Sequence, residues 1–143
     1  MGISSITRAA ILDLTFLALA WADYAQNDGS GPQTHVSFAL QTADPGAGGT
    51  MSSNEASYTG YGRMDVPRSA AGFTRTANSV SPNVDISYPV GTGGGGNLTH
   101  FATGHTWTGG GEPILWSGTV TPNVNSGAGI RPILLATTTI TLT

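Results

Sequence analysis

The chain has 143 residues, which predicts one domain that can bury roughly two-thirds of its unfolded surface. It contains no cysteine, which excludes disulfides, thiolate metal sites and a cysteine nucleophile. Charged residues are only 9% of the chain, against about 25% in an ordinary soluble domain, and lysine is absent. A net charge of −3 without a basic stripe argues against nucleic-acid binding, and the lack of lysine excludes Schiff-base and P-loop chemistry.

The first segment, Ser4 to Ala25, is the only one with helical periodicity. Its apolar residues recur at spacings of three and four and are expected to share one face: Ile6, Ala10, Leu14, Leu17, Trp21 and Tyr24. Ser4 or Ser5 can cap the start, and the polar, glycine-rich stretch at 27–32 ends the pattern. We therefore predict a helix at about residues 4–25.

The same segment partly imitates a secretory signal, because Arg8 precedes an apolar run and Ala18-Leu19-Ala20 resembles a cleavage site. Asp13 interrupts the apolar region, however, and the uncharged run Leu14–Ala22 is far shorter than the roughly 20 residues that span a bilayer. We interpret the segment as a helix of the folded domain and predict no membrane association.

From Thr34 onward the apolar pattern has a period of two. Val36, Phe38 and Leu40 should face one way, and the residues between them the other. Similar runs follow, separated by Gly, Pro and Asn turns, at Tyr58–Val66, Gly72–Thr76, Val84–Val90, Leu98–Thr103, Ile114–Val120 and Ile133–Leu142, the last as a long terminal strand. The prediction is a mainly β, single domain over 1–143, with one N-terminal helix and an antiparallel, jelly-roll-like β-sandwich at about 34–142.

Catalytic patterns are weak. Gly91, Gly93 and Gly96 match G-x-G-x-x-G, but a strand follows them where a dinucleotide site needs a helix. His100, His105 and Glu112 could ligate a metal only if a bulge brings the two histidines to one face.

The remaining acids offer no better pattern. Asp65, Asp85, Glu55 and Glu112 are dispersed rather than spaced as a glycosidase pair, and no G-x-S-x-G elbow is present. We predict no enzyme, no cofactor and no metal. Aromatic residues leave two interpretations open, core packing or a sugar-binding platform: Tyr58, Tyr61, Trp107 and Trp116.

Several stretches taken together resemble a family of small virion proteins of tailed phages. They are "TFLALAW", "VSFALQTADPGAGG", "SNEASYTGYGRMDVPR", "DISYPVGTGGGGNLTHFATG" and "ILWSGTVTPNVNSGAGIRPILLATTTITL", and they cover about Thr15 to Leu142. Members are commonly labelled tail-fibre proteins, and others of this type coat phage heads as trimeric decoration, or cement, proteins. The sequence departs from the family pattern after "THF", at Ala102 to His105. The family pattern has no catalytic residues to carry over.

The resemblance implies a structural virion protein, made in the host cytoplasm. We expect a homotrimeric capsid decoration protein on the head surface that binds the major capsid protein and stabilises the shell. A tail-fibre or baseplate-associated protein and a virion carbohydrate-binding module are the alternatives. The low charge predicts assembly that depends little on salt.

The long loop Ala43–Ser57 is the expected contact with a neighbouring protein. Its small residues let a loop lie flat against another subunit, and its free backbone groups supply hydrogen bonds without desolvating charge. The candidate interface residues are Gly46, Gly48, Gly49, Ser52 and Asn54, with Arg63 and Arg68 beyond the loop. The alternative is a surface loop without a partner.

Overall fold

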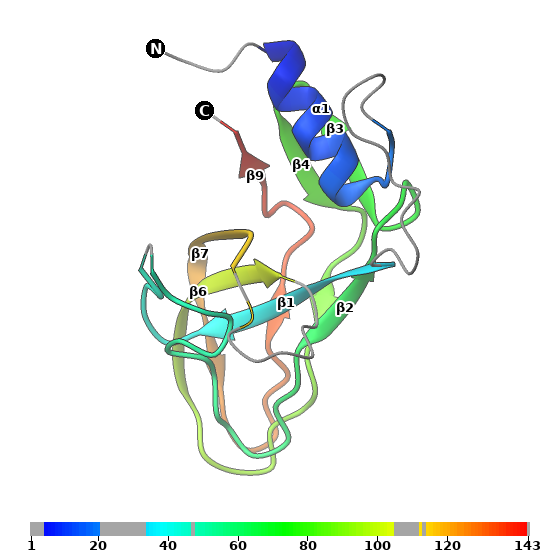
Figure 1. The fold of residues 1–143 in the computed structure, drawn as a ribbon. Helices are drawn as coiled ribbons and strands as arrows, with labels where there is room; N and C mark the ends of the chain where they lie inside the picture. The colour runs from blue at the N-terminus through cyan, green and yellow to red at the C-terminus, as the bar shows by residue number, and fades with distance from the viewer. Residues whose placement is uncertain (1–4, 21–33, 47, 105–111, 113, 143) are drawn as a thin grey trace.

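The computed structural model describes residues 5–20, 34–46, 48–104, 112 and 114–142, and it is mainly β with one N-terminal helix (Figure 1). The elements are α1 (Ser5–Phe16), β1 (His35–Gln41), β2 (Met64–Pro67), β3 (Phe73–Thr76), β4 (Ser79–Pro82), β5 (Ile86–Ser87), β6 (Gly96–Gly104), β7 (Trp116–Ser126), β8 (Ile133–Leu134) and β9 (Ile140–Thr141). The expected fold class is confirmed.

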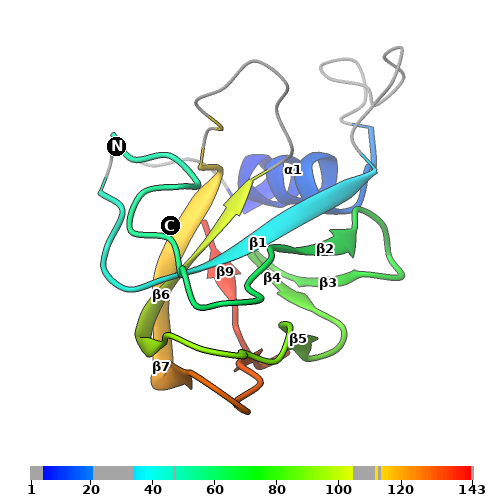
Figure 2. The same ribbon diagram turned by 90° about the horizontal axis from the view of Figure 1, so that it is seen from below.

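All strand pairs in the three sheets are antiparallel. The largest sheet has the order β2-β1-β6-β7, seen from below in Figure 2; the others are β3-β4-β9 and β5-β8. One hydrophobic core joins the sheets, because the ring of Phe38 lies 6.1 Å from that of Phe73 and 6.3 Å from that of Phe101. In these strand orders, β7 and β9 each lie at a free edge of their sheet.

Helix α1 is shorter than predicted and buries a different face. It ends at Phe16, residues 17–20 are not helical, and residues 21–25 lie outside the described part. Ala18 adopts a left-handed φ of 56°, which ends the helix, and the amide of Leu19 turns back to donate to the carbonyl of Asp13 at 3.2 Å. The fully buried residues are Leu12 and Phe16, not the expected stripe that contains Ala10 and Leu14.

Strand β1 is buried on both faces, whereas simple alternation suggested that one face could be exposed. Every residue from Val36 to Gln41 is buried. The second face is covered by Met51, which lies in the long loop and packs with Ala39 and Ala102. The loop at 43–57, for which the sequence predicts no regular structure, thus covers the second face of β1.

The C-terminal prediction needs correction. The expected long strand Ile133–Leu142 is two short strands, β8 and β9, separated by a turn in which the amide of Thr138 donates to the carbonyl of Leu135 at 2.9 Å. The sequence pattern does not predict strand β4, because Ser81-Pro82-Asn83 is typical of a turn. Pro82 lies at the end of that strand, where its missing N–H is tolerated.

Candidate functional site

The loop Ala43–Ser57, called the 43–57 loop below, folds back on the largest sheet. The amide of Thr42 donates to the carbonyl of Asn54 and that of Ala56 to the carbonyl of Leu40, each at 2.8 Å. Met51 is fully buried between these anchors. The base and middle of the loop are therefore part of the core structure.

The predicted contact residues occupy different positions in this loop. Gly46, Gly48, Ser52 and Asn54 are exposed, so they are accessible to a partner. Gly49 is half-buried, and a Cβ there would lie 2.2 Å from the carbonyl oxygen of Pro45. Their contact with a neighbouring protein stays a prediction.

Arg63 holds the 43–57 loop in place through hydrogen bonds to side chains of the same chain. Its Nε and Nη2 donate to the two carboxylate oxygens of Glu55 at 2.7 and 2.8 Å, its Nη1 donates to Glu112, and Nη2 also donates to Ser52 Oγ at 3.1 Å. The paired carboxylates raise the pKa of Arg63 above its ordinary value. All three side chains of this ion-pair cluster are mostly buried, at 17–23% side-chain exposure.

Arg68 and Arg75 both bind helix α1. Arg68 donates to the main-chain carbonyls of Leu14 and Thr15, each at 2.6 Å, and Arg75 pairs with the carboxylate of Asp13. Burial lowers the pKa of Arg68. With Arg63, three of the chain's five basic residues have partners inside the chain, so little positive charge is left to bind other molecules.

Of the candidate catalytic and metal-binding residues, the structure brings Glu55 and Glu112 together. Glu55 and Glu112 are joined by Arg63, while Asp65 accepts a hydrogen bond from Ser37 and Asp85 from the amide of Ala136. His100 lies on β6 with its Nδ1 2.8 Å from Thr99 Oγ1, and His105 falls outside the described residues. Within the described residues, no three His, Asp or Glu side chains are grouped as metal ligands.

The glycine run at 91–96 packs backbone against backbone. A Cβ on Gly91 would lie 2.3 Å from the carbonyl oxygen of Gly127, and one on Gly95, where φ is +136°, would lie 2.2 Å from that of Ser126. As predicted, a strand and not a helix follows, since β6 begins at Gly96. The run therefore serves packing.

The described tyrosines form a core cluster rather than an exposed platform. Tyr88 is fully buried and stacks on Tyr61 at 6.2 Å, while Tyr58 is 4% exposed and donates to the carbonyl of Pro89. Burial raises the pKa of all three hydroxyls. Trp116 is half-buried against Phe16, at a ring distance of 5.0 Å, and Trp107 lies outside the described residues.

An exposed apolar surface surrounds the small β5-β8 sheet. We call it the β5–β8 patch; its members are Val84, Val90, Ile130, Ile133 and Leu135, which are 38–71% exposed. The pairing of Ser87 with Ile133, and the hydrogen bond from the amide of Gly91 to the carbonyl of Ile130, bring these segments side by side. Sequence reasoning missed the patch, because its members alternate with buried residues on short strands.

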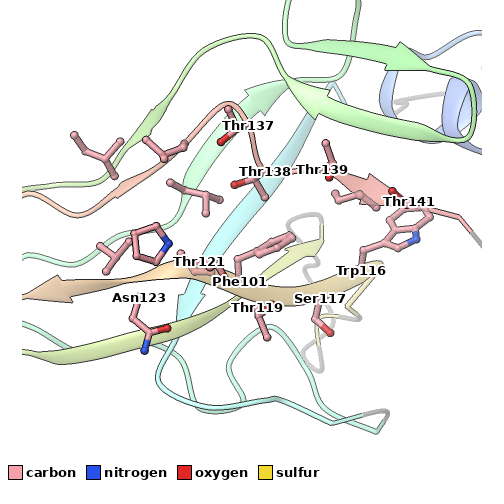
Figure 3. Close-up of a pocket in the computed structure, with 18 residues that line it drawn as sticks. Phe101, Trp116, Ser117, Thr119, Thr121, Asn123, Thr137, Thr138, Thr139 and Thr141 are labelled. Atoms are coloured by element: carbon pink, nitrogen blue, oxygen red, sulfur yellow. The ribbon is translucent and has the colours of Figure 1, made fainter.

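A cleft of about 540 Å³ opens between β7 and the segment from β8 to β9. Figure 3 shows Phe101 and Trp116 on the β7 side of the cleft and four threonines on the other, Thr137, Thr138, Thr139 and Thr141. The side chains of Ser117, Thr119 and Asn123 point from β7 away from these threonines, and they line the rim of the cleft. No ionisable side chain lines the cleft in the part of the chain that the structure describes.

Among the described residues, no helix is both long and apolar enough to cross a membrane. No curated protein sequence matches the chain. A family model described as podophage GP4 fiber I protein gp80 matches residues 2–141. Because this match spans nearly the whole sequence, the chain belongs to that family of small structural proteins of the tailed-phage virion.

Proposed function

We propose that this chain is a structural subunit of the tail fibre of a phage virion, where it holds neighbouring protein chains together and catalyses no reaction. The family description, a podophage fiber protein, supports the fibre location. The observation that carries the adhesive role is the β5–β8 patch, an exposed apolar surface of the kind that marks protein–protein contacts.

The partner that we propose for this patch is a second copy of the chain, in a homotrimer. Charge does not oppose self-association, because the net charge is only −3 and the guanidinium groups of Arg63, Arg68 and Arg75 are held within the chain. Neutral interfaces of this kind gain their stability from apolar burial and backbone hydrogen bonds, and they are little screened by salt. The exposed residues of the 43–57 loop would then be free to contact a different virion protein.

Decoration of the head shell is the second candidate. It is favoured by the compact shape of the described residues, which contain no elongated shaft (Figure 1). A compact subunit suits a lattice, where many modest contacts with the major capsid protein add up through multivalency.

The copy number per purified virion, measured by quantitative mass spectrometry against the major capsid protein, tests both candidates. A few copies per particle, with antibody label at the tail in electron micrographs, is the result expected for a fibre subunit. A ratio close to that of the shell protein, with label over the head, would replace the fibre by the decoration role. Absence from the virion would overturn both.

The homotrimer is tested separately on the purified chain by light scattering coupled to size exclusion. The expected mass is three times the 14.5 kDa of one chain, at both low and high salt. A monomeric mass at micromolar concentration would contradict the self-association proposal and leave the location of the protein to the virion experiment.

A further inference from the structure

The cleft between β7 and the C-terminal segment has the properties of a ligand site. Its volume of about 540 Å³ lies within the range of roughly 300–1,000 Å³ typical of small-molecule sites. It opens where two sheets end, since β7 is the last strand of the largest sheet and β9 the last of the three-stranded sheet. Backbone and side chains along both edges are therefore accessible from solvent.

Both sides of the cleft combine apolar surface with hydroxyl groups. The β7 side offers apolar surface from Trp116, Phe101 and Pro122, with the hydroxyls of Thr119 and Thr121 beside them. The facing segment offers apolar surface from Ile133, Leu135 and Ile140. It also offers the hydroxyls of Thr137, Thr138 and Thr139 (Figure 3), none of which has a hydrogen-bond partner within the described part of the chain. Each such hydroxyl can donate one hydrogen bond and accept two.

We propose that this cleft binds a neutral saccharide. A sugar ring presents apolar C–H groups on its faces and hydroxyls around its rim, which matches a cleft lined by an indole, a proline and aliphatic side chains interspersed with threonine hydroxyls. None of the described residues that line the cleft is ionisable, so they offer no charge pairing to a phosphate, a carboxylate or an ammonium ligand. The uncharged lining therefore favours an uncharged ligand over a charged one.

Trp116, one of the aromatic residues for which the sequence leaves core packing and a sugar-binding platform open, belongs to this site. Its ring is half-buried because one part packs on Phe16, 5.0 Å away, and this packing fixes the indole at the end of the cleft beside Thr141 (Figure 3). A ring held by the core loses little conformational entropy when a ligand stacks on it.

The test measures binding of the purified full-length chain to an array of neutral and acidic bacterial oligosaccharides. The best neutral oligosaccharide is then titrated by NMR at low and at high ionic strength, about 0.01 M and about 1 M, where the Debye lengths differ about tenfold. We expect binding to neutral sugars, a Kd that is unchanged by salt, and chemical-shift changes at the amides of residues 137–141. This assay does not depend on where the protein sits in the virion, so its failure and that of the proposed fibre role are distinguishable.

Two variants locate the site. The double substitution Thr138→Val and Thr139→Val keeps the side-chain shape, removes two hydroxyls, and should weaken binding about tenfold. Thr139→Arg should abolish binding, because it adds bulk and charge at the mouth of the cleft. Thr76→Val is the matched control, since Thr76 is an exposed threonine on β3, outside the cleft, and its loss should leave the Kd unchanged.

Three results would overturn the proposal. They are no binding to any neutral sugar on the array or by NMR at millimolar concentration, a preference for acidic sugars, and an unchanged Kd in the Thr138→Val, Thr139→Val variant. A variant that changes the oligomeric mass without changing sugar binding would assign the cleft to an edge strand from a second copy instead.

Discussion

The guanidinium Nε of Arg68 lies 2.6 Å from the carbonyl oxygen of Thr15, a residue 53 positions earlier in the chain. It thereby satisfies one of the main-chain acceptors that every helix leaves open at its last turn, and its Nη2 satisfies that of Leu14. The positive charge also interacts favourably with the negative end of the helix dipole. The side chain of Arg68, directly after β2, thus caps the end of α1 and ties the helix to the sheets.

Replacing Arg68 by Met should destabilise the fold by about 2 kcal/mol, because two charge-assisted hydrogen bonds are lost and two helix carbonyls are left without this donor. Guanidinium chloride unfolding followed by circular dichroism measures the change. Arg131→Met is the matched control, since Arg131 is exposed, and it should change the free energy of unfolding by less than about 0.5 kcal/mol. Equal effects of the two substitutions would contradict a capping role.

Arg63→Met should loosen the 43–57 loop, because Glu55 and Glu112 would keep mostly buried charges without their partner. We expect a loss of about 2 kcal/mol in stability and faster cleavage by thermolysin near Met51. Mass spectrometry of the fragments identifies the cut. Arg63→Lys should restore little of the lost stability, because one ammonium cannot replace the planar guanidinium that contacts two carboxylates. Full stability in the lysine variant would argue against this role of the Arg63 guanidinium.

Gly49 and Gly48 form a matched pair in that loop. Gly49→Ala places a Cβ 2.2 Å from the carbonyl oxygen of Pro45, which forces the loop to shift, so thermal unfolding should occur several degrees lower. Gly48→Ala meets nothing within 4 Å and should leave the Tm unchanged or slightly raised. If both variants melt alike, the loop does not adopt this backbone in solution.

The tyrosine cluster should make the free energy of unfolding fall at alkaline pH. Burial raises the pKa of Tyr58, Tyr61 and Tyr88 above the ordinary value of 10.0, so these hydroxyls ionise first in the unfolded chain. Their contribution to stability is therefore complete below pH 10 and is lost as the pH rises above it. Ultraviolet titration of the folded protein should show late ionisation of these tyrosines, and denaturation at a series of pH values should show the loss.

Tyr88→Phe tests the innermost member of this cluster. The Tyr88 hydroxyl is buried and has no hydrogen-bond partner within the described part of the chain, so its removal should raise stability by about 1 kcal/mol at neutral pH and flatten the alkaline loss. Denaturation of the variant at a series of pH values measures both effects. A large loss of stability at neutral pH would instead reveal a hydrogen bond to bound water.

The β5–β8 patch predicts how self-association can be broken. Ile133→Asp with Leu135→Asp should shift the trimer to monomer and leave the monomer folded, because both side chains already face solvent in the single chain. Light scattering gives the mass and circular dichroism the fold. Leu115→Asp, at the similarly exposed Leu115 outside the patch, is the control and should remain trimeric. A trimeric double variant would move the subunit interface elsewhere.

Parts of the fold followed from local pattern. Strands β1, β3 and β6 lie where alternation placed them, and the glycine run leads into a strand as expected. The helix was predicted too long, because Leu17 to Ala20 are good helix formers whose preference is overridden by the left-handed turn at Ala18. The terminal strand was predicted without its break, because no Gly, Pro, Asn or Asp marks the turn at Ala136 and Thr137.

The sequence by itself determined the fold class, the neutral character of the surface and the exclusion of lysine and cysteine chemistry, because composition and short-range periodicity are properties of the chain alone. Only the tertiary structure decided which loop covers the second face of β1, what the arginines bind, and that threonines near the C-terminus face an indole across a cleft. Arg63 and Glu112 are 49 positions apart, and Arg68 and Thr15 are 53 apart. Contacts at such separations depend on how the sheets pack, and packing is not encoded in any single stretch.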